Sequence, residues 1–278
     1  MRLGLGVLPN KPIKEIVKIA ETAEEKHFDY VIMPEIIPSE RDAFTTLTAL
    51  ASRTKRIKLN LETDPLVRHP VLTTIAALTL HEFSDNRAMI SLRSGVPATL
   101  EALTIPINKL KKGAKAVKEA VELMGLLFSG RKVDFDGETL KTLGVRLFQK
   151  PKQRVPIYIQ SSNQAEMLRL SGEIGDGVLL PCPLEYFDYA VEMVMDGAAA
   201  VGRDISTFDF ALSLAWYVTE EGSAQGLDLL KWEVGFRIAI SPSDLFKAIG
   251  MKLKPVEELK KVFLHEPKKV PRYVTDEM

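Results

Sequence analysis

Short apolar runs and amphipathic segments alternate along the first 240 residues of the chain. Runs of strand length lie at 2–8, 30–33, 57–61, 88–92, 155–160, 178–180 and 208–218. Segments with apolar residues at helical spacing lie at 12–26, 41–52, 71–82, 114–128, 167–174, 184–200 and 224–240. Parallel strands need a crossover of helix length, so this alternation predicts an α/β fold with a parallel sheet.

Polar residues follow the carboxyl ends of the predicted strands. They are Glu35, the segment 62–64, Ser94 with Gly95, the segment 161–164, and Cys182. An open doubly wound sheet and a barrel both fit the alternation, but only in a barrel do these ends converge on one rim. We therefore predict a TIM-type (β/α)8 barrel. Because no eighth strand is expected, the barrel is predicted to be incomplete, with helices after residue 224 or a neighbouring chain covering its open edges.

The length of the chain fits a single α/β barrel domain spanning residues 1–278. Within it, the Asp136-Gly137 dipeptide is a hairpin signal and predicts an inserted β-excursion at about 131–148. Two short helical patterns start at Ser243 and Pro255, and they predict a helical C-terminal segment over 241–278.

The segment Val155–Pro181 predicts a strand, a polar turn, an amphipathic helix and a second strand. Its turn, residues 161–164, would place free backbone N–H groups and two hydroxyls at a helix N-terminus, where a phosphate or carboxylate is favoured. Ser and Asn are also ordinary helix caps, and the turn alone favours capping without a ligand. Both interpretations stay open.

Charge and cysteine content exclude several classes of function. The 37 basic side chains balance 37 acidic ones, so no overall field favours nucleic acid or an anionic membrane as a partner. A single cysteine, Cys182, excludes an internal disulfide and is expected to be an inert buried thiol, and the four histidines show no metal-ligand spacing. The longest nearly apolar run, 210–218, is too short to cross a bilayer and no signal region opens the chain, so we expect a cytoplasmic protein.

Five motifs occur in a recognisable order. They are Phe28-Asp29-Tyr30-Val31 before Glu35, the run Thr63–Pro70, Asn86-Arg87 through Ser94-Gly95, Pro156–Ile159, and Gly172–Gly177. Together they resemble the bacterial luciferase-like superfamily of flavin and deazaflavin oxidoreductases, most of all its archaeal methylenetetrahydromethanopterin reductase branch. The resemblance covers residues 1 to about 220 and implies a (β/α)8 barrel with a coenzyme across its rim.

The resemblance also implies a reaction and a set of site residues. It implies hydride transfer between a deazaflavin, coenzyme F420, or alternatively FMN, and a small organic substrate such as a tetrahydromethanopterin derivative. Glu35 is the implied catalytic residue, near the reacting edge of the coenzyme ring. The implied coenzyme-binding residues are Leu61, Glu62, Thr63 and Asp64 at the ring, Arg93, Ser94 and Gly95 beside it, and Ser161, Ser162, Asn163, Gln164 and Gly177 at the phosphate.

Departures from the family pattern keep a second function open. Relatives tend to have small residues at 61 and 62, a histidine after the acidic residue and glycine at 93, whereas this chain has Leu61, Glu62, Ile36 and Arg93. Arg93 could bind a phosphate or carboxylate, or fill the pocket. The alternative is therefore a non-catalytic flavin- or ligand-binding barrel that has lost turnover, and an Arg93 side chain lying in the ring site would favour it.

The resemblance further implies a homodimer that pairs through the helices at 41–52 and 71–82. The apolar residues Phe44, Leu47, Leu50, Ile75 and Leu78 exceed what one barrel wall is expected to need. Ordinary packing of these helices within the barrel is the alternative.

Overall fold

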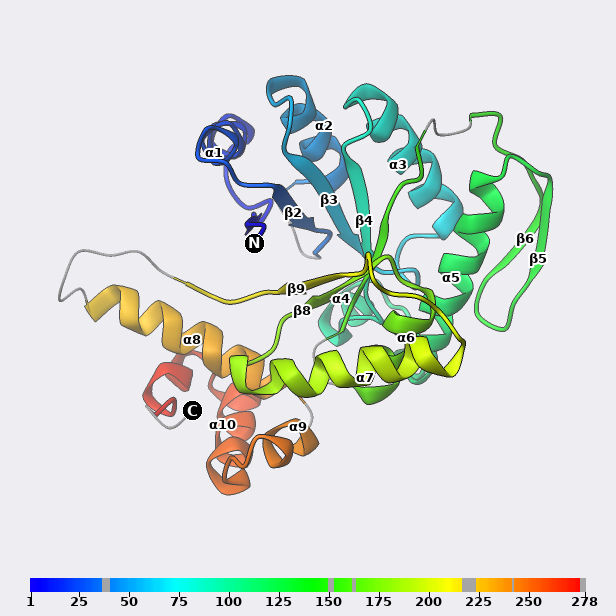
Figure 1. Cartoon of the computed structure of the whole chain (residues 1–278). Coiled ribbons are helices and arrows are strands. Elements are labelled where there is room, and N and C mark those ends of the chain that lie inside the picture. The colour runs from blue at the N-terminus through cyan, green and yellow to red at the C-terminus, as the bar shows by residue number, and fades with distance from the viewer. Residues whose placement is uncertain (37–40, 150–152, 162–163, 217–223, 242, 276–278) are drawn as a thin grey trace.

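Seven parallel strands form one twisted sheet whose order follows the chain (Figure 1). The computed structural model describes residues 1–36, 41–149, 153–161, 164–216, 224–241 and 243–275. The strands are β1 (Gly4–Gly6), β2 (Tyr30–Pro34), β3 (Lys58–Thr63), β4 (Ala88–Leu92), β7 (Ile157–Gln160), β8 (Gly177–Leu180) and β9 (Asp209–Leu212). Each strand pairs in parallel with the next, so neighbours in the chain are neighbours in the sheet.

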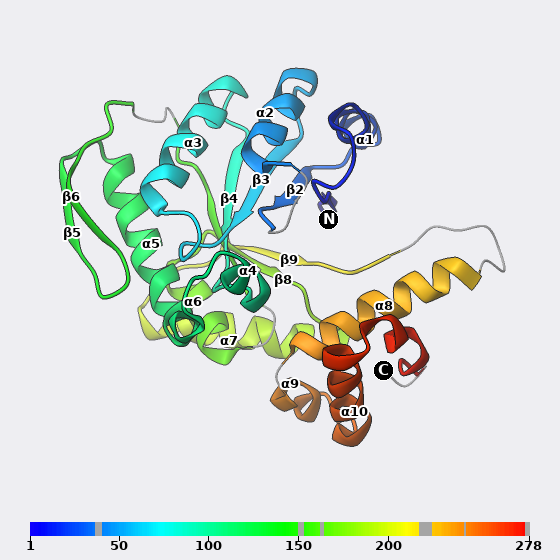
Figure 2. The same cartoon turned by 180° about the vertical axis from the view of Figure 1, so that it is seen from behind.

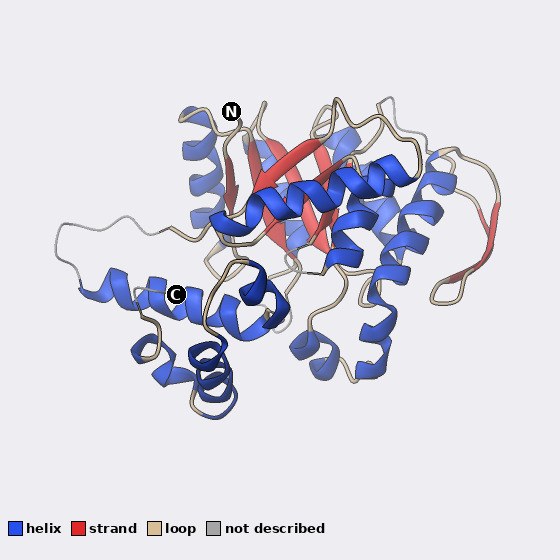
Figure 3. Ribbon diagram, turned by 60° about the horizontal axis from the view of Figure 1, so that its bottom comes forward, coloured by secondary structure: helices blue, strands red, loops and turns tan. Residues whose placement is uncertain are grey.

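Helices cover the outer face of this sheet (Figures 2 and 3). The helices around the sheet are α1 (Ile13–Glu25), α2 (Ala43–Arg53), α3 (Pro70–Phe83), α5 (Gly113–Phe128), α6 (Ala165–Ile174) and α7 (Phe187–Ala200). Four more of the described helices lie outside this ring (Figure 2): α4 (Pro97–Ala102), α8 (Ala224–Ile240), α9 (Ser243–Ala248) and α10 (Leu253–His265). Contacts run from α1 to α2, α3, α5, α6 and α7 in turn around the sheet. The predicted incomplete TIM-type barrel is confirmed, because the strand order and the outer ring of helices are those of a barrel with seven strands.

The two faces of the strands differ in polarity. Residues facing the helices are apolar and buried, for example Val31, Leu59 and Ile90. The inward positions include a row in one register that joins Glu62, Ser91, Tyr158, Gly177 and Asp209. The barrel interior is therefore polar, and Asn60 Nδ2 of β3 donates a 2.9 Å hydrogen bond to Ser91 Oγ of the neighbouring strand β4.

Asp209 ties the two edge strands together at the amino end of the barrel. In the described chain β1 pairs only with β2, and β9 pairs only with β8. Arg2 lies 2.6 Å from Asp209, and the hydroxyls of Tyr158 and Tyr30 donate to the same carboxylate at 2.6 and 3.3 Å. Burial and the Asp209 charge raise the pKa of Tyr158, which keeps this phenol a donor. These contacts fill the amino end, so the carboxyl ends form the accessible rim.

The last three helices form a group beside α7 and share a buried cluster with β8 (Figure 1). One buried cluster joins Val178 and Leu180 of β8 to Leu245 of α9 and to Val256 and Leu259 of α10. Helices after residue 224, or a neighbouring chain, were expected to cover the open edges of the barrel; the described helices join a side-chain cluster with β8 and do not extend the ladder at either edge strand. The cluster covers the face of these strands, and β9 still has only β8 as a ladder partner in the described chain.

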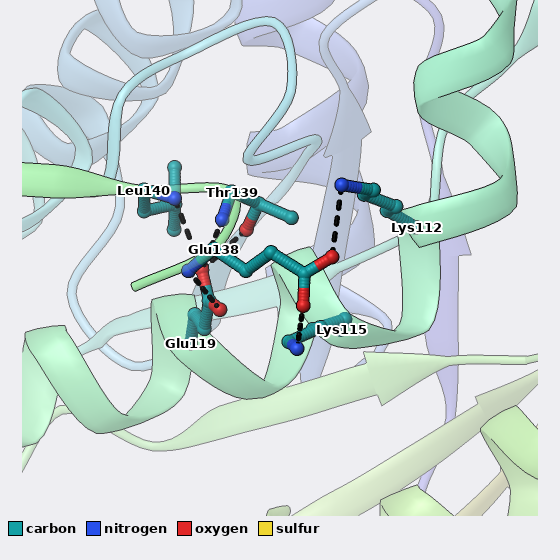
Figure 4. A network of polar contacts seen from close by, with 6 residues as sticks. All are labelled: Lys112, Lys115, Glu119, Glu138, Thr139 and Leu140. Carbon is teal, nitrogen blue, oxygen red and sulfur yellow. Dashed lines mark hydrogen bonds and ion pairs between the residues drawn. The ribbon is translucent and has the colours of Figure 1, made fainter. Parts of the chain in front are cut away.

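The insertion after α5 is an antiparallel hairpin of β5 (Val133–Asp136) and β6 (Lys141–Val145), as the Asp136-Gly137 signal predicted. Glu119 of α5 holds its turn (Figure 4). The carboxylate accepts hydrogen bonds from the backbone N–H groups of Glu138, Thr139 and Leu140 at 2.8, 2.9 and 3.0 Å, and from the Thr139 hydroxyl. Lys112 and Lys115 pair with Glu138 from the start of the same helix.

Two expectations about elements were wrong. The predicted long strand 208–218 is only four residues, because β8 ends at Leu180 and offers no further ladder partner after Leu212; residues 217 and 218 lie outside the described residues. Residues 99–111, for which the sequence pattern predicted no regular element, contain part of α4 and a 3-10 helix, Ile107–Lys112. Of the five residues proposed for dimer contacts, Phe44, Leu47, Leu50 and Leu78 are buried in the barrel wall, and Ile75 is exposed.

Candidate functional site

Three carboxylates and two arginines meet where β2, β3 and β4 end. Main-chain bonds extend the ladder into this rim, since Glu35 N donates to Glu62 O at 2.7 Å and Arg93 N donates to Thr63 O at 3.0 Å. The backbone positions of Glu35 and Arg93 are thus set by the sheet, and their side chains project beyond the strands. The structure brings together the implied catalytic residue and the implied ring site.

Glu35 is held by two partners. Its Oε2 accepts a 2.5 Å hydrogen bond from the Thr63 hydroxyl, and its Oε1 lies 3.3 Å from Arg68 Nη1. The Arg68 guanidinium also stacks over the ring of Phe44, 4.6 Å from its centroid. Glu35 is therefore a paired and partly exposed carboxylate, fixed in orientation, rather than a free base.

Glu62 and Arg93 form a buried ion pair between neighbouring strands. Arg93 Nη1 lies 2.5 Å from Glu62 Oε1, and the two side chains are 11% and 10% exposed. The second terminal nitrogen of Arg93 donates to the Glu35 carbonyl, and its Nε is buried without a partner among the described residues. The Arg93 side chain thus lies back across the ends of β3 and β2, over the implied ring site.

Asp64 is almost fully buried beside this pair. Its Oδ1 accepts a 2.8 Å hydrogen bond from Leu66 N, whereas its Oδ2 is buried with no partner in the described chain. Burial raises the pKa of Asp64 to about 6, with the Leu66 N–H and Arg93 opposing the shift and Glu35 adding to it. A carboxyl group with such a pKa, in a cluster at the rim of a barrel, is typical of a functional site.

The implied phosphate site shows unused hydrogen-bonding capacity. Helix α6 begins after Gln164, whose side chain makes no cap hydrogen bond. Ser161 is buried, its N donates to Leu179 O at 3.0 Å, and its hydroxyl has no described partner. Ser162 and Asn163 lie outside the described residues. The buried Ser161 hydroxyl, without a partner among the described residues and beside the start of α6, is compatible with an anionic ligand there; capping by Ser162 or Asn163 falls outside the described residues.

Ser94 and Gly95 shape the loop after β4. Gly95 has φ of +103°, a conformation that side chains rarely adopt. The first residue of α5, Gly113, packs directly on this loop, since a Cβ there would lie 2.4 Å from Ser94 O. The start of α5 is therefore fixed against the same rim.

Gly177 does not join the other implied phosphate residues. It is the first residue of β8, at the amino end of the strand, and a Cβ there would lie 2.8 Å from the Tyr158 ring. Glycine is needed at this position for packing rather than for a ligand at the rim.

Cys182 is buried, and burial raises the pKa of its thiol to about 11, in agreement with an inert thiol. His69 is the N-cap of α3 and accepts from Val71 N.

Two rim residues were missed by the sequence analysis as site residues. Arg68 lies within the Thr63–Pro70 motif, where its basic character two residues before a helix was the available signal. Gln160 ends β7 on the inward side, and its Oε1 is buried without a described partner.

In the described part of the chain, no three His, Cys, Asp or Glu side chains form a metal-binding group, and no helix has the length and hydrophobicity to cross a membrane.

Comparisons with known proteins agree with this geometry. Residues 1–236 match the family described as luciferase-like monooxygenase. The chain is 31% identical to a 5,10-methylenetetrahydromethanopterin reductase of Methanolobus tindarius, over 90% of this chain and 76% of the relative. It is 30% identical to the enzyme of the same name from Archaeoglobus fulgidus, over 100% of this chain and 84% of the relative.

A solved structure is similar over nearly the whole chain. It is the coenzyme F420 dependent tetrahydromethanopterin reductase from Methanopyrus kandleri, with a TM-score of 0.88, 23% identity, and coverage of 99% of this chain and 83% of that one. At this identity the likeness shows the fold. The family match extends over residues 1–236, and the two reductases are 30% or more identical over 90% or more of this chain. The chain therefore belongs to the luciferase-like monooxygenase family.

Proposed function

We propose that this protein is an oxidoreductase that transfers hydride between a deazaflavin, coenzyme F420, and a small organic substrate such as a tetrahydromethanopterin derivative. The observation that carries the proposal is the rim, where Ser161 and the start of α6 offer an unused anion site on the same edge as the Glu35 cluster. The names of the relatives in the family, two methylenetetrahydromethanopterin reductases and one F420-dependent reductase structure, support the same reaction class and coenzyme.

The residues present fit the phosphate end of such a coenzyme. The Ser161 hydroxyl and backbone N–H groups at the start of α6 would hold the phosphate, and the Gln160 amide lies at the end of the neighbouring strand β7. When bound, a deazaflavin supplies a hydride-carrying ring carbon. The protein's part is to position the groups and exclude water: Glu35 is fixed by Thr63 and Arg68, and Asp64 holds a carboxyl that exchanges its proton close to neutral pH.

A non-catalytic coenzyme-binding barrel is the second candidate, and a specific observation favours it. Arg93 occupies the surface at the ends of β3 and β2, which was the arrangement expected to weaken the enzyme hypothesis. FMN in place of the deazaflavin is the alternative coenzyme for either candidate, because the family also includes flavin-dependent members.

Two assays separate these candidates. Fluorescence titration of the purified chain with coenzyme F420 and with FMN tests binding, and we expect saturation by one of them at tens of micromolar or below. Hydride transfer is then tested by mixing the protein anaerobically with the reduced deazaflavin and methylenetetrahydromethanopterin. The absorbance of the oxidised deazaflavin, which returns as hydride leaves the coenzyme, monitors the reaction. Binding without substrate-dependent oxidation would favour the non-catalytic barrel, and absence of binding to either coenzyme would end the proposal.

We also propose a homodimer, with a corrected contact surface. The exposed side of α3 carries Leu72, Ile75 and Phe83 at spacings that put them on one helix face. Exposed apolar side chains gathered on one face are typical of an interface. Light scattering at micromolar concentration should give twice the chain mass for the wild type and for Leu126→Arg on α5, but one chain mass for Leu72→Arg. A single-chain mass for the wild type would refute the dimer.

Two further expectations are retained as proposals. Residues 1–278 would form a single domain in which the hairpin of β5 and β6 and the helices after residue 241 are attached to the barrel, and one cooperative unfolding transition is expected. The protein would also act in the cytoplasm, which fractionation of its source cells tests.

A further inference from the structure

The Glu62–Arg93 ion pair spans the ends of three adjacent strands. Glu62 lies in β3 opposite Ser91 of β4, and Arg93 follows two residues later, so the arginine side chain must turn back to reach the carboxylate. It continues to the carbonyl of Glu35 beyond β2. The Arg93 backbone is fixed by its bond to Thr63 O, so only the side chain is free to move away. The Glu62–Arg93 pair therefore lies over the strand ends, and a rotation of the Arg93 side chain would expose them.

The two residues depend on each other. Each charge is about nine-tenths buried and has the other as its ionic partner. Removing one partner would leave a buried unpaired charge, which is strongly unfavourable. Glu62 and Arg93 are two of the departures from the pattern of the resembled family, and in the structure these two residues contact each other. They act as a unit.

We propose that the Glu62–Arg93 pair is a specificity-determining gate of the coenzyme site: a flat coenzyme ring reaches the ends of β3 and β4 only when Arg93 has moved away from Glu62. This inference rests on the proposed function. The gate leaves the anion site at Ser161 untouched, so the phosphate end of a coenzyme binds in either state. The closed pair lowers the affinity for the whole coenzyme, because part of the binding free energy is used to break a buried, charge-assisted hydrogen bond.

The test removes both residues together. The double variant Glu62→Gly/Arg93→Gly takes away the pair without leaving a lone charge, and Glu62→Ala/Arg93→Ala does the same with less backbone freedom. Arg154→Gly is the matched control, because Arg154 pairs with Asp176 at 2.6 Å at the amino end of the strands, away from the rim. Each protein is titrated with coenzyme F420 and with FMN by fluorescence, and its fold is checked by circular dichroism.

We expect at least one folded double variant to bind one of the two coenzymes ten times more tightly than the wild type or better, which is about 1.4 kcal/mol. Arg154→Gly should bind like the wild type. Equal or weaker binding by both folded double variants overturns the gate, and if the wild type binds normally the proposed function still stands. If neither the wild type nor any folded variant binds either coenzyme, the gate and the proposed function both fail.

Discussion

Replacing Asp64 by asparagine should make the protein more stable at neutral pH. Asparagine keeps an oxygen for the Leu66 N–H, which now bonds to Asp64 Oδ1 at 2.8 Å, and it removes the charge from a side chain that is only 2% exposed. Burial raises the pKa of this carboxyl from 3.8 to about 6. The folded state therefore holds the proton more tightly than the unfolded chain does, and ionisation of Asp64 opposes folding.

The sign and size of the effect follow from that difference. The contribution of Asp64 to stability is most favourable below pH 4, declines as the pH rises from about 4 to 6, and is fully lost above pH 6. A shift of about two pH units corresponds to about 3 kcal/mol at pH 7, and to about half of that at pH 5. Asp64→Asn should therefore be more stable than the wild type at pH 7 by at most about 3 kcal/mol, since the amide NH2 takes the buried place of Oδ2, which has no described partner, and the margin should be smaller at pH 5.

Urea unfolding, monitored by far-ultraviolet circular dichroism at pH 7 and pH 5, measures the free energy of unfolding of the variant and of the wild type. The exposed Asp188→Asn serves as control, and it should change the free energy of unfolding by less than about 0.5 kcal/mol at either pH. A destabilised Asp64→Asn protein at pH 7, or a difference from the wild type that does not vary with pH, would refute the reasoning. A more stable variant that binds coenzyme less well would show that Asp64 is kept for function.

Two more predictions concern buried charges that hold the fold. Glu119→Gln turns an amide NH2 toward backbone N–H groups that now donate to a carboxylate, so the amide hydrogens of residues 133–145 should exchange faster, as if the hairpin had lost about 2 to 4 kcal/mol of stability. The exposed Glu122→Gln on the same helix should leave this exchange unchanged. Unchanged protection in Glu119→Gln would show that Glu119 does not hold the hairpin turn. Arg87 donates hydrogen bonds to Ser84 O, Thr54 Oγ1, Ile57 O, Ala51 O and Thr54 O, and lysine cannot reproduce this planar array, so Arg87→Lys should lower the free energy of unfolding by about 2 to 4 kcal/mol. A loss below about 1 kcal/mol in Arg87→Lys would show that the charge alone suffices there.

The barrel could be predicted from sequence because its signals are local. The run at 88–92 is apolar and bounded by turns, and β4 has those same limits. The run at 208–218 is as apolar, but a strand also needs a neighbour with free ladder groups, and β8 ends opposite Leu212. The length of a strand thus depends on the neighbouring strand as well, and the apolar content of one segment does not reveal it.

Some features of the rim could likewise be predicted from the sequence, and others could not. Glu35, Glu62 and Asp64 were identified because each follows a predicted strand, and their meeting at one edge follows from the parallel sheet. The contact between Glu62 and Arg93 could not be predicted, since it depends on the register of β3 against β4 and on an arginine side chain that turns back. Gly177 was misassigned because a glycine packed against Tyr158 and a glycine needed near a ligand look identical in a sequence.

The exposed face of α3 was misjudged for a related reason. Apolar residues in α2 and α3 were counted correctly, but which of them face the sheet depends on the rotation of each helix about its axis. In the structure Leu47 and Leu50 face inward, and Leu72, which was not named, faces out. Helical spacing identifies a stripe, and only packing decides whether a second stripe exists.

A crystal structure of the protein with bound coenzyme F420 tests the central claim most directly. The account predicts the phosphate at the start of α6 within hydrogen-bond distance of Ser161 Oγ, the ring over the ends of β3 and β4, and the Arg93 side chain turned away from Glu62. A coenzyme bound elsewhere, or a ring at the rim beside an intact Glu62–Arg93 pair, would contradict it.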